Sequence, residues 1–235
     1  FSKRGFFFDI SQCCKLPCSK MNSYAYIWLI LSGSIVGAIV YFKKGTPVFL
    51  RVLPVYLLIT FTVEYIGQWM NDNGKVTVTL YNVFTTMEFV FYFWMLRYMV
   101  RNRWAKRLLF HSLWFYPVLV ILNILFLLKD MQFHTITYSF GGFLIVIATI
   151  IYFFELFQFD KPVNLVREPA FWICSGLLFF YACTFPLYAL INFFEDPSNI
   201  IIKNIASILA VVNILLYSSF IIAALCRIRI RKSFS

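Results

Sequence analysis

Long apolar runs that recur at short intervals constrain this chain more than any other feature. Each run approaches or exceeds the roughly 18 residues that a helix needs to cross the hydrocarbon core of a bilayer. In lipid every backbone N–H and C=O group must be paired inside the protein, which leaves helices or a closed barrel. Barrel strands alternate between apolar and polar residues, whereas these runs are continuous. The sequence therefore predicts an all-α membrane fold.

The composition agrees with lipid as the solvent of this fold. Hydrophobic residues make up 61% of the chain and charged residues 13%, whereas a soluble domain is about half apolar and about a quarter charged. We therefore expect a polytopic protein whose main partner is the lipid bilayer. The sequence predicts a bundle of seven transmembrane helices, at residues 24–42, 48–70, 80–100, 108–128, 134–157, 170–194 and 200–226.

The first 20 residues differ from the rest of the chain. They begin with Phe, are of mixed composition and precede Met21, which stands directly before the first apolar run. We expect residues 1–20 to be a non-native or disordered leader and residues 21–235 to form a single seven-helix domain. A disulfide cluster outside the cell is the alternative, since this segment holds Cys13, Cys14 and Cys18.

The distribution of Lys and Arg predicts the orientation of the bundle. Alternate connections and the C-terminal tail hold fourteen of these residues, against three in the remaining connections. Cytoplasmic connections carry such an excess, so we expect the N-terminus outside and the C-terminus in the cytoplasm. The same rule accounts for the net charge of +11 without nucleic acid, which we do not expect as a partner.

Three glutamates lie within the apolar runs. An ionised carboxylate near the bilayer centre costs about 2.5–3.5 kcal/mol on insertion scales, which makes it a functional hypothesis. Glu64 and Glu88 lie about two turns below the outer surface on consecutive helices, so we expect them at similar depth. Glu155 lies near the inner end of its helix, where we expect it to pair with Lys161 or Arg167.

Other polar residues accompany the first two glutamates. Tyr81, Thr85, Glu88 and Tyr92 follow helical spacing and form one stripe. Thr60, Glu64 and Gln68 form another stripe on the preceding helix, and we predict that the two stripes line a polar pocket that opens outward. Its candidate binding residues are Glu64, Gln68, Tyr81, Asn82, Thr85, Glu88, Tyr92, Asn123, Asn192 and Asn213. The alternative is that they only join helices, through hydrogen bonds that contribute about 0.6 kcal/mol each.

Two pairs of glycines predict where helices approach closely. Gly33 and Gly37 have a spacing that brings helix backbones together, and we interpret it as packing within the bundle rather than as a dimer face. Gly141 and Gly142 are expected to do the same in the helix at 134–157.

Most enzymatic chemistries find little support. The chain has two histidines, His111 and His134, too few for a His-rich metal site, and we predict neither a metal nor a cofactor. No Ser or Cys has an evident His base, and no phosphate-binding motif occurs.

The segment Tyr81-Asn82-Val83-Phe84, followed by Glu88-Phe89, and the passage from Tyr41 to Glu64 resemble a group of uncharacterised seven-helix bacterial inner-membrane proteins. The resemblance covers residue 21 to the end, and none of its motifs is tied to an activity. It implies a multi-pass protein of the inner (cytoplasmic) membrane. Some bacterial seven-helix modules of this size act as sensor inputs beside histidine kinases, which favours a signalling function by analogy of fold.

The leading functional hypothesis is therefore a sensor or receptor-like module with an outward-facing polar pocket. The alternative is a small transporter, proton-coupled in one version, that uses Glu64 and Glu88, and a membrane-embedded enzyme comes third. A cytoplasmic signalling partner or anionic lipid is expected at the tail and at Arg101, Arg103, Lys106 and Arg107.

Overall fold

The computed structural model describes residues 17–42, 46–127, 133–158, 165–191 and 199–232. In this part of the chain all regular structure is helical, which confirms the predicted all-α fold. The helices are α2 (Pro17–Tyr41), α3 (Val48–Asp72), α4 (Val78–Met99), α5 (Arg103–Leu122), α6 (Thr135–Phe157), α7 (Pro169–Ile191) and α8 (Asn199–Lys232), with a π-helical turn η1 (Asn123–Leu127) and a 3-10 turn η2 (Leu165–Arg167).

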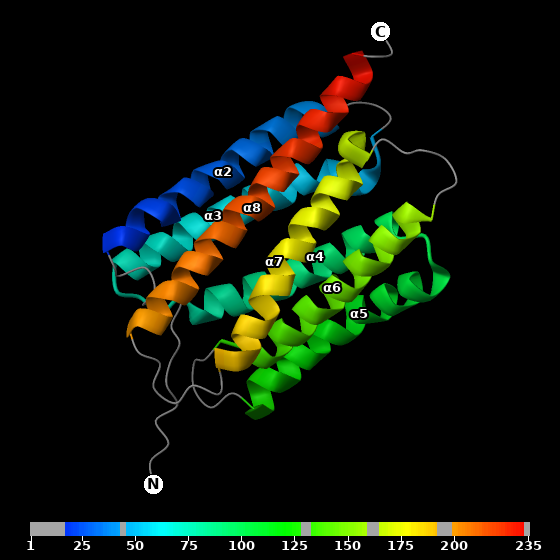
Figure 1. Ribbon diagram of the computed structural model, residues 1–235. Helices are drawn as coiled ribbons and strands as arrows, with labels where there is room; N and C mark the ends of the chain where they lie inside the picture. The colour runs from blue at the N-terminus through cyan, green and yellow to red at the C-terminus, as the bar shows by residue number, and fades with distance from the viewer. Residues whose placement is uncertain (1–16, 43–45, 128–132, 159–164, 192–198, 233–235) are drawn as a thin grey trace.

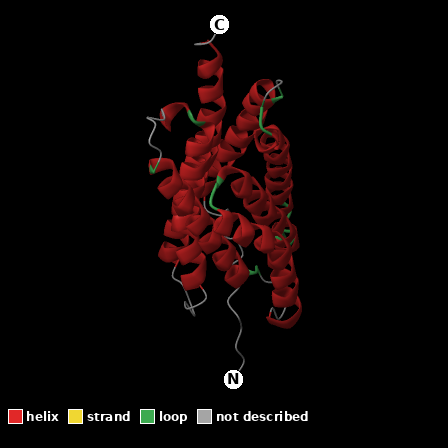
Figure 2. Cartoon of the chain, turned by 90° about the vertical axis from the view of Figure 1, so that its right-hand side faces the viewer, coloured by secondary structure: helices red, strands yellow, loops and turns green. Residues whose placement is uncertain are grey.

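The long helices lie side by side in one bundle (Figure 1). α2 packs between α3 and α8, α8 packs on α7, and α7 packs on α6. On the other side α4 contacts α5 and α6, and it closes the ring through a smaller contact with α3. Figure 2 shows the bundle turned by 90°, with helices along its whole length.

Five helical segments in the described residues are long and apolar enough to cross a membrane, which makes this a multi-pass membrane protein. They are Val48–Asp72, Arg103–Phe126, Thr135–Phe157, Pro169–Ala189 and Ser207–Cys226. α4 is 22 residues long but is not among them, and the apolar segment Tyr26–Tyr41 of α2 is shorter. The count of seven spans stays a prediction.

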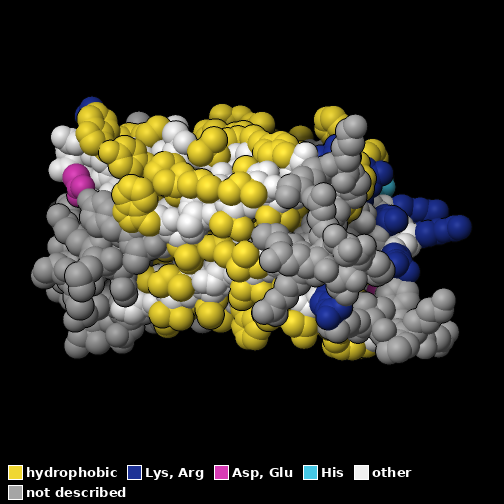
Figure 3. Space-filling model, turned by 90° about the horizontal axis from the view of Figure 1, so that it is seen from above, with side chains coloured by type: hydrophobic (Ala, Val, Ile, Leu, Met, Phe, Trp, Pro, Cys, Tyr) yellow, Lys and Arg dark blue, Asp and Glu magenta, His cyan; other side chains and the backbone are white. Residues whose placement is uncertain are grey.

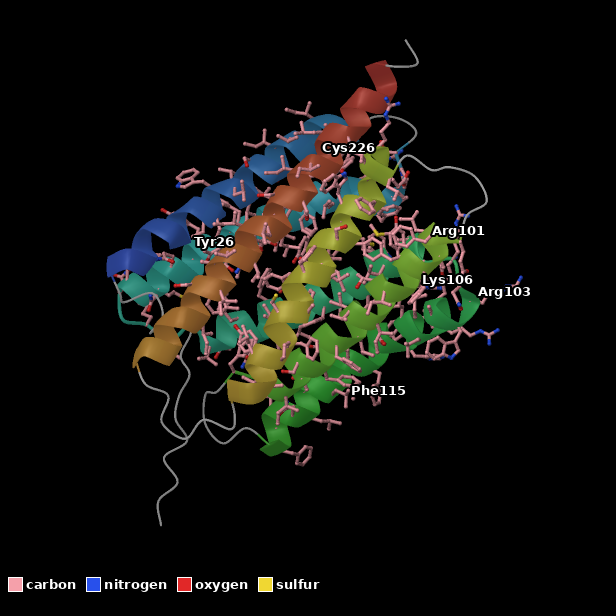
Figure 4. All side chains as sticks on the ribbon, viewed as in Figure 1. Tyr26, Arg101, Arg103, Lys106, Phe115 and Cys226 are labelled. Atoms are coloured by element: carbon pink, nitrogen blue, oxygen red, sulfur yellow. The ribbon has the colours of Figure 1, made fainter. Side chains whose placement is uncertain are left out.

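The outer surface fits contact with lipid. Large apolar side chains point outward along the bundle, including Trp114 at 73% exposure and Phe126 at 78%. On the face in Figure 3, apolar side chains cover the middle and Lys and Arg side chains gather at one end. Arg101, Arg103 and Lys106 lie at one end of the bundle in Figure 4.

The start of α5 differs from the expectation. The sequence places the start of this helix at residue 108, whereas α5 begins at Arg103, so that boundary was wrong by five residues. Asn102 is the physical reason, because its Oδ1 accepts hydrogen bonds from the backbone N–H groups of Trp104 at 2.8 Å and Ala105 at 3.4 Å. A side chain that caps the first turn stabilises a helix start. Arg103, Lys106 and Arg107 therefore lie in the first turns of α5 rather than in a connection.

Two other boundaries also move outward. α2 begins at Pro17 and continues through residue 21, and α8 continues to Lys232 beyond the expected end at residue 226. The basic tail is thus helical up to that residue.

The glycines pack as predicted. A Cβ on Gly33 would lie 3.3 Å from Ile221 of α8, and one on Gly37 would lie 3.0 Å from Pro54 of α3. This confirms that the glycine pair packs within the bundle. Gly142 likewise lies against α7, since its Cβ would be 3.0 Å from the Cβ of Phe185.

Candidate functional site

Glu64 on α3 is bound by tyrosines from two other helices. The Tyr26 hydroxyl of α2 donates to Glu64 Oε2 at 2.9 Å, and the Tyr81 hydroxyl of α4 donates to the same oxygen at 3.4 Å. Gly67, one turn along α3, leaves the room that Tyr81 occupies, because a Cβ there would lie 2.9 Å from Tyr81 Cζ. The partly buried Glu64 carboxylate therefore joins α2, α3 and α4.

Glu88 on α4 is buried, with 8% of its surface exposed. The Tyr56 hydroxyl of α3 donates to Glu88 Oε1 at 3.1 Å and lies 3.1 Å from the Tyr92 hydroxyl. A hydroxyl carries one proton, so when Tyr56 donates to Glu88 it accepts from Tyr92. Tyr56 is fixed by a stacked ring, Phe91, at 4.1 Å between centroids. The result is a short chain of hydrogen bonds that ends on the carboxylate.

These two hydrogen-bonded groups are together called the carboxylate layer; its members are Glu64, Glu88, Tyr26, Tyr56, Tyr81 and Tyr92. Glu88 lies within electrostatic range of Glu64. Neither carboxylate forms a salt bridge within the described residues. Six tyrosines, from α3 to α8, are within electrostatic range of Glu88: Tyr56, Tyr92, Tyr116, Tyr138, Tyr181 and Tyr217.

A second polar group surrounds His134, which is fully buried just before α6. Thr137 Oγ1 lies 2.8 Å from His134 Nδ1, and Thr85 Oγ1 lies 2.9 Å from Nε2. Because Thr85 donates to the Tyr81 carbonyl at 2.7 Å, its oxygen accepts from Nε2–H, and Thr137 then donates to Nδ1. This assigns the neutral Nε2–H tautomer. Asn82 and Asn123 complete this His134 group, through contacts of 3.3 Å to the His134 N–H and to Thr137.

The protonation of His134 follows from its surroundings. Burial lowers the pKa of this histidine, which precedes the span that begins at Thr135, to about 4. Its ring also stacks on Phe133, at 4.9 Å between centroids. The imidazole is therefore neutral near pH 7, in agreement with the hydrogen bonds.

The structure divides the predicted site residues between these two groups. Glu64, Tyr81, Glu88 and Tyr92 lie in the carboxylate layer, whereas Asn82, Thr85 and Asn123 lie in the His134 group.

Two predicted residues, Gln68 and Asn213, lie outside both groups, and a third is not described. Gln68 is buried, and its Nε2 has no hydrogen-bond partner among the described residues. The Asn213 side chain donates to the Leu209 carbonyl one turn back on its own helix. Asn192 lies outside the described residues.

Sequence reasoning missed four functional candidates: Tyr26, Tyr56, His134 and Thr137. For His134 a signal exists, since a histidine three residues before a threonine at a helix start can bond to it. Tyr26 and Tyr56 carry no such signal, because tyrosine is common in membrane helices at the interface.

The third glutamate is held by backbone N–H groups that the sequence does not predict as partners. Glu155 near the end of α6 accepts from the backbone N–H groups of Arg101 at 2.6 Å and Asn102 at 2.7 Å. Lys161, one of its expected partners, lies outside the described residues. Glu155 thereby ties α6 to the loop before α5.

No group of three metal-ligating residues occurs among the residues that the structure describes. Comparisons with protein-family models, with curated proteins and with solved structures find no match for this chain. The fold and the two polar groups define the class of protein: an all-helical, multi-pass membrane protein with one buried and one partly buried carboxylate between its helices.

Proposed function

We propose that this protein is a sensor or receptor-like membrane module whose input acts on the carboxylate layer. One observation carries the proposal: each carboxylate accepts a hydrogen bond from at least one tyrosine on a neighbouring helix. Binding of a proton or a ligand at Glu64 or Glu88 changes those bonds. It therefore changes how α2, α3 and α4 hold one another.

The helix α4 connects the carboxylate layer to the far end of the bundle, which supports the proposal. α4 carries Tyr81, Glu88 and Tyr92, and it ends directly before Arg101 and the basic start of α5. Because a helix moves largely as a rigid body, a shift of α4 at the carboxylate layer reaches that end. Glu155 anchors the loop there through the N–H groups of Arg101 and Asn102.

Infrared difference spectroscopy of the reconstituted protein tests the input. We expect a pH step to change the C=O stretch of a protonated carboxylic acid in the wild type, and Glu88→Gln to remove or shift this band. Glu155→Gln is the matched control, because Glu155 lies outside the layer and should leave the band in place. If no carboxyl band responds to pH or to any added solute, the layer is a structural element and the proposal fails.

Transport is the second candidate, and the presence of Glu64 and Glu88 within electrostatic range on neighbouring helices favours it. Carboxyl groups that follow one another are found in proton pathways of membrane transporters. Proton or solute flux in proteoliposomes that disappears in Glu88→Gln would support transport. A carboxyl band that responds to pH without flux would support the sensor.

We propose further that the exposed basic residues at the start of α5 contact a cytoplasmic signalling partner or anionic lipid. Arg101, Arg103, Lys106 and Arg107 are exposed, and the side chain of Trp104 beside them is 64% exposed. Basic residues at a membrane surface attract anionic headgroups, each by about 1 kcal/mol. Reconstitution with and without phosphatidylglycerol distinguishes the two. If lipid binds there, this anionic lipid should raise the thermal stability of the wild type. The increase should be smaller in the double variant Lys106→Gln/Arg107→Gln.

The topology is proposed with this function: seven spans in the bacterial inner membrane, the N-terminus outside and the C-terminus in the cytoplasm. The excess of Lys and Arg at one end supports it. Single cysteines in a cysteine-free background test it. Asn73→Cys should react with an impermeant maleimide added to intact spheroplasts, and Lys106→Cys should react only after lysis.

A further inference from the structure

Two buried tyrosine hydroxyl groups lack a hydrogen-bond partner in the part of the chain that the structure describes. The side chains of Tyr116 on α5 and Tyr181 on α7 are 1% and 0% exposed. Neither hydroxyl has a hydrogen-bond partner among the described residues. Because leaving a buried hydroxyl unpaired is costly, such a pair points to a bound group that hydrogen-bonds to the two oxygens.

Close packing holds the two rings in place. Both lie against Phe89, with centroids at 4.9 Å for Tyr116 and 5.4 Å for Tyr181. Two glycines of α6 leave no space for the rings to retreat, because a Cβ on Gly141 would lie 2.8 Å from Tyr116 Cε2 and one on Gly142 would lie 3.1 Å from Tyr181 Cδ1. The two rings therefore cannot move toward α6.

The electrostatics of this position favour a cation. Tyr116 and Tyr181 lie within electrostatic range of each other and of Glu88. Among the described residues, Glu64 and four further tyrosines also lie within electrostatic range of Glu88. An ionised Glu88, which forms no salt bridge among the described residues, is neutralised either by a bound proton or by a cation.

We propose that Glu88, Tyr116 and Tyr181 form a binding site for a small primary ammonium cation between α4, α5 and α7. The carboxylate supplies the charge, and the two phenol oxygens accept N–H hydrogen bonds that a bare proton on Glu88 leaves unmade. The aromatic faces around the position add attraction for an ammonium group. This inference rests on the proposed function and names the ligand class of its carboxylate layer.

Thermal unfolding of the purified full-length protein tests the site. The probes are methylammonium, sodium and tetramethylammonium chloride, each against N-methylglucamine chloride at equal ionic strength and pH. Methylammonium should raise the melting temperature in a saturable manner, because a ligand that binds only the folded state stabilises it. Sodium and tetramethylammonium should have little effect, since neither has N–H donors.

Variants then locate the site. Tyr116→Phe and Tyr181→Phe keep the packed rings. Each should weaken binding and so raise the half-saturating concentration of methylammonium about tenfold. Glu88→Gln should abolish the effect. Tyr98→Phe on α4 is the matched control, because this exposed side chain lies outside the site and its loss should change nothing.

The outcomes separate this inference from the function on which it rests. Equal stabilisation by sodium, or unchanged methylammonium binding in both tyrosine variants, overturns the ammonium site. A carboxyl band that responds to pH while no cation stabilises the wild type overturns the ammonium site alone. Absence of both the band and the stabilisation overturns the proposed function as well.

Discussion

Replacing Tyr56 by Phe removes one oxygen atom and retains the ring that stacks on Phe91. The missing hydroxyl lies 3.1 Å from Glu88 Oε1 and 3.1 Å from the Tyr92 hydroxyl. The substitution therefore isolates the hydrogen bonds that join α3 to α4, two consecutive helices whose direct contact is small. We expect it to lower the free energy of unfolding.

The size of the loss depends on the charge of Glu88. A buried hydrogen bond to an ionised group contributes about 1.5–3 kcal/mol, whereas a hydrogen bond between helices in lipid averages about 0.6 kcal/mol. We expect Tyr56→Phe to cost about 2 kcal/mol at a pH where Glu88 is ionised. In the Glu88→Gln background the same change should cost about 0.6 kcal/mol, since the partner is then neutral. The coupling free energy is the difference, about 1.4 kcal/mol, and it lies in the range for residues in contact.

Unfolding in mixed micelles titrated with denaturing detergent, followed by tryptophan fluorescence, measures these free energies for the wild type, the two single variants and the double variant. Tyr65→Phe is the control, because Tyr65 is on the same helix but 59% exposed. Equal costs of Tyr56→Phe with Glu and with Gln at position 88 would refute the argument, because the hydroxyl would then not act through the carboxylate.

Three further expectations follow from the packing, the cap and the buried histidine. Gly141→Ala should lower the free energy of unfolding by about 1–3 kcal/mol, because its Cβ would lie 2.9 Å from Phe89 and 2.8 Å from Tyr116; Gly33→Ala, whose nearest contact is 3.3 Å, should cost less in the same titration. Asn102→Ala should cost about 1 kcal/mol through loss of the α5 cap, and Asn102→Asp should restore most of it. Because the folded pKa of His134 is about 4 against an ordinary value of 6.5, the unfolded chain binds more protons between these values, so stability should fall as pH drops from about 6.5 to about 4. In His134→Gln this slope should flatten, and an unchanged slope would contradict the assignment of a buried neutral imidazole.

Local sequence signals determined the helical fold. Continuous apolar runs force the backbone to pair within each segment, so the helices follow from the runs without tertiary information. Glycine spacing also acts locally, and the packing of Gly33 and Gly37 within the bundle was predicted on that basis. Asn102 was equally readable as a helix cap, but its basic neighbours led to the prediction of a longer connection.

The tertiary structure alone decided which polar residues meet. Glu64 and Glu88 stand out in the sequence because carboxylates are rare in membrane helices, yet their partners Tyr26 and Tyr56 are 38 and 32 residues away. The sequence does not distinguish these two tyrosines from other tyrosines near a membrane interface. Only the packing of the helices shows that their hydroxyls meet the carboxylates.

The partners in the His134 group also could not be predicted from the sequence, and they are separated by more residues. His134 and Asn82 are separated by 52 residues, and hydrogen bonds between them depend on the register of α4 against α6. Composition and helical periodicity thus determined that this chain forms apolar helices with a few costly polar groups. Helix packing, which sets the rotation and depth of each helix, decided that these groups divide into a carboxylate layer and a histidine-centred group.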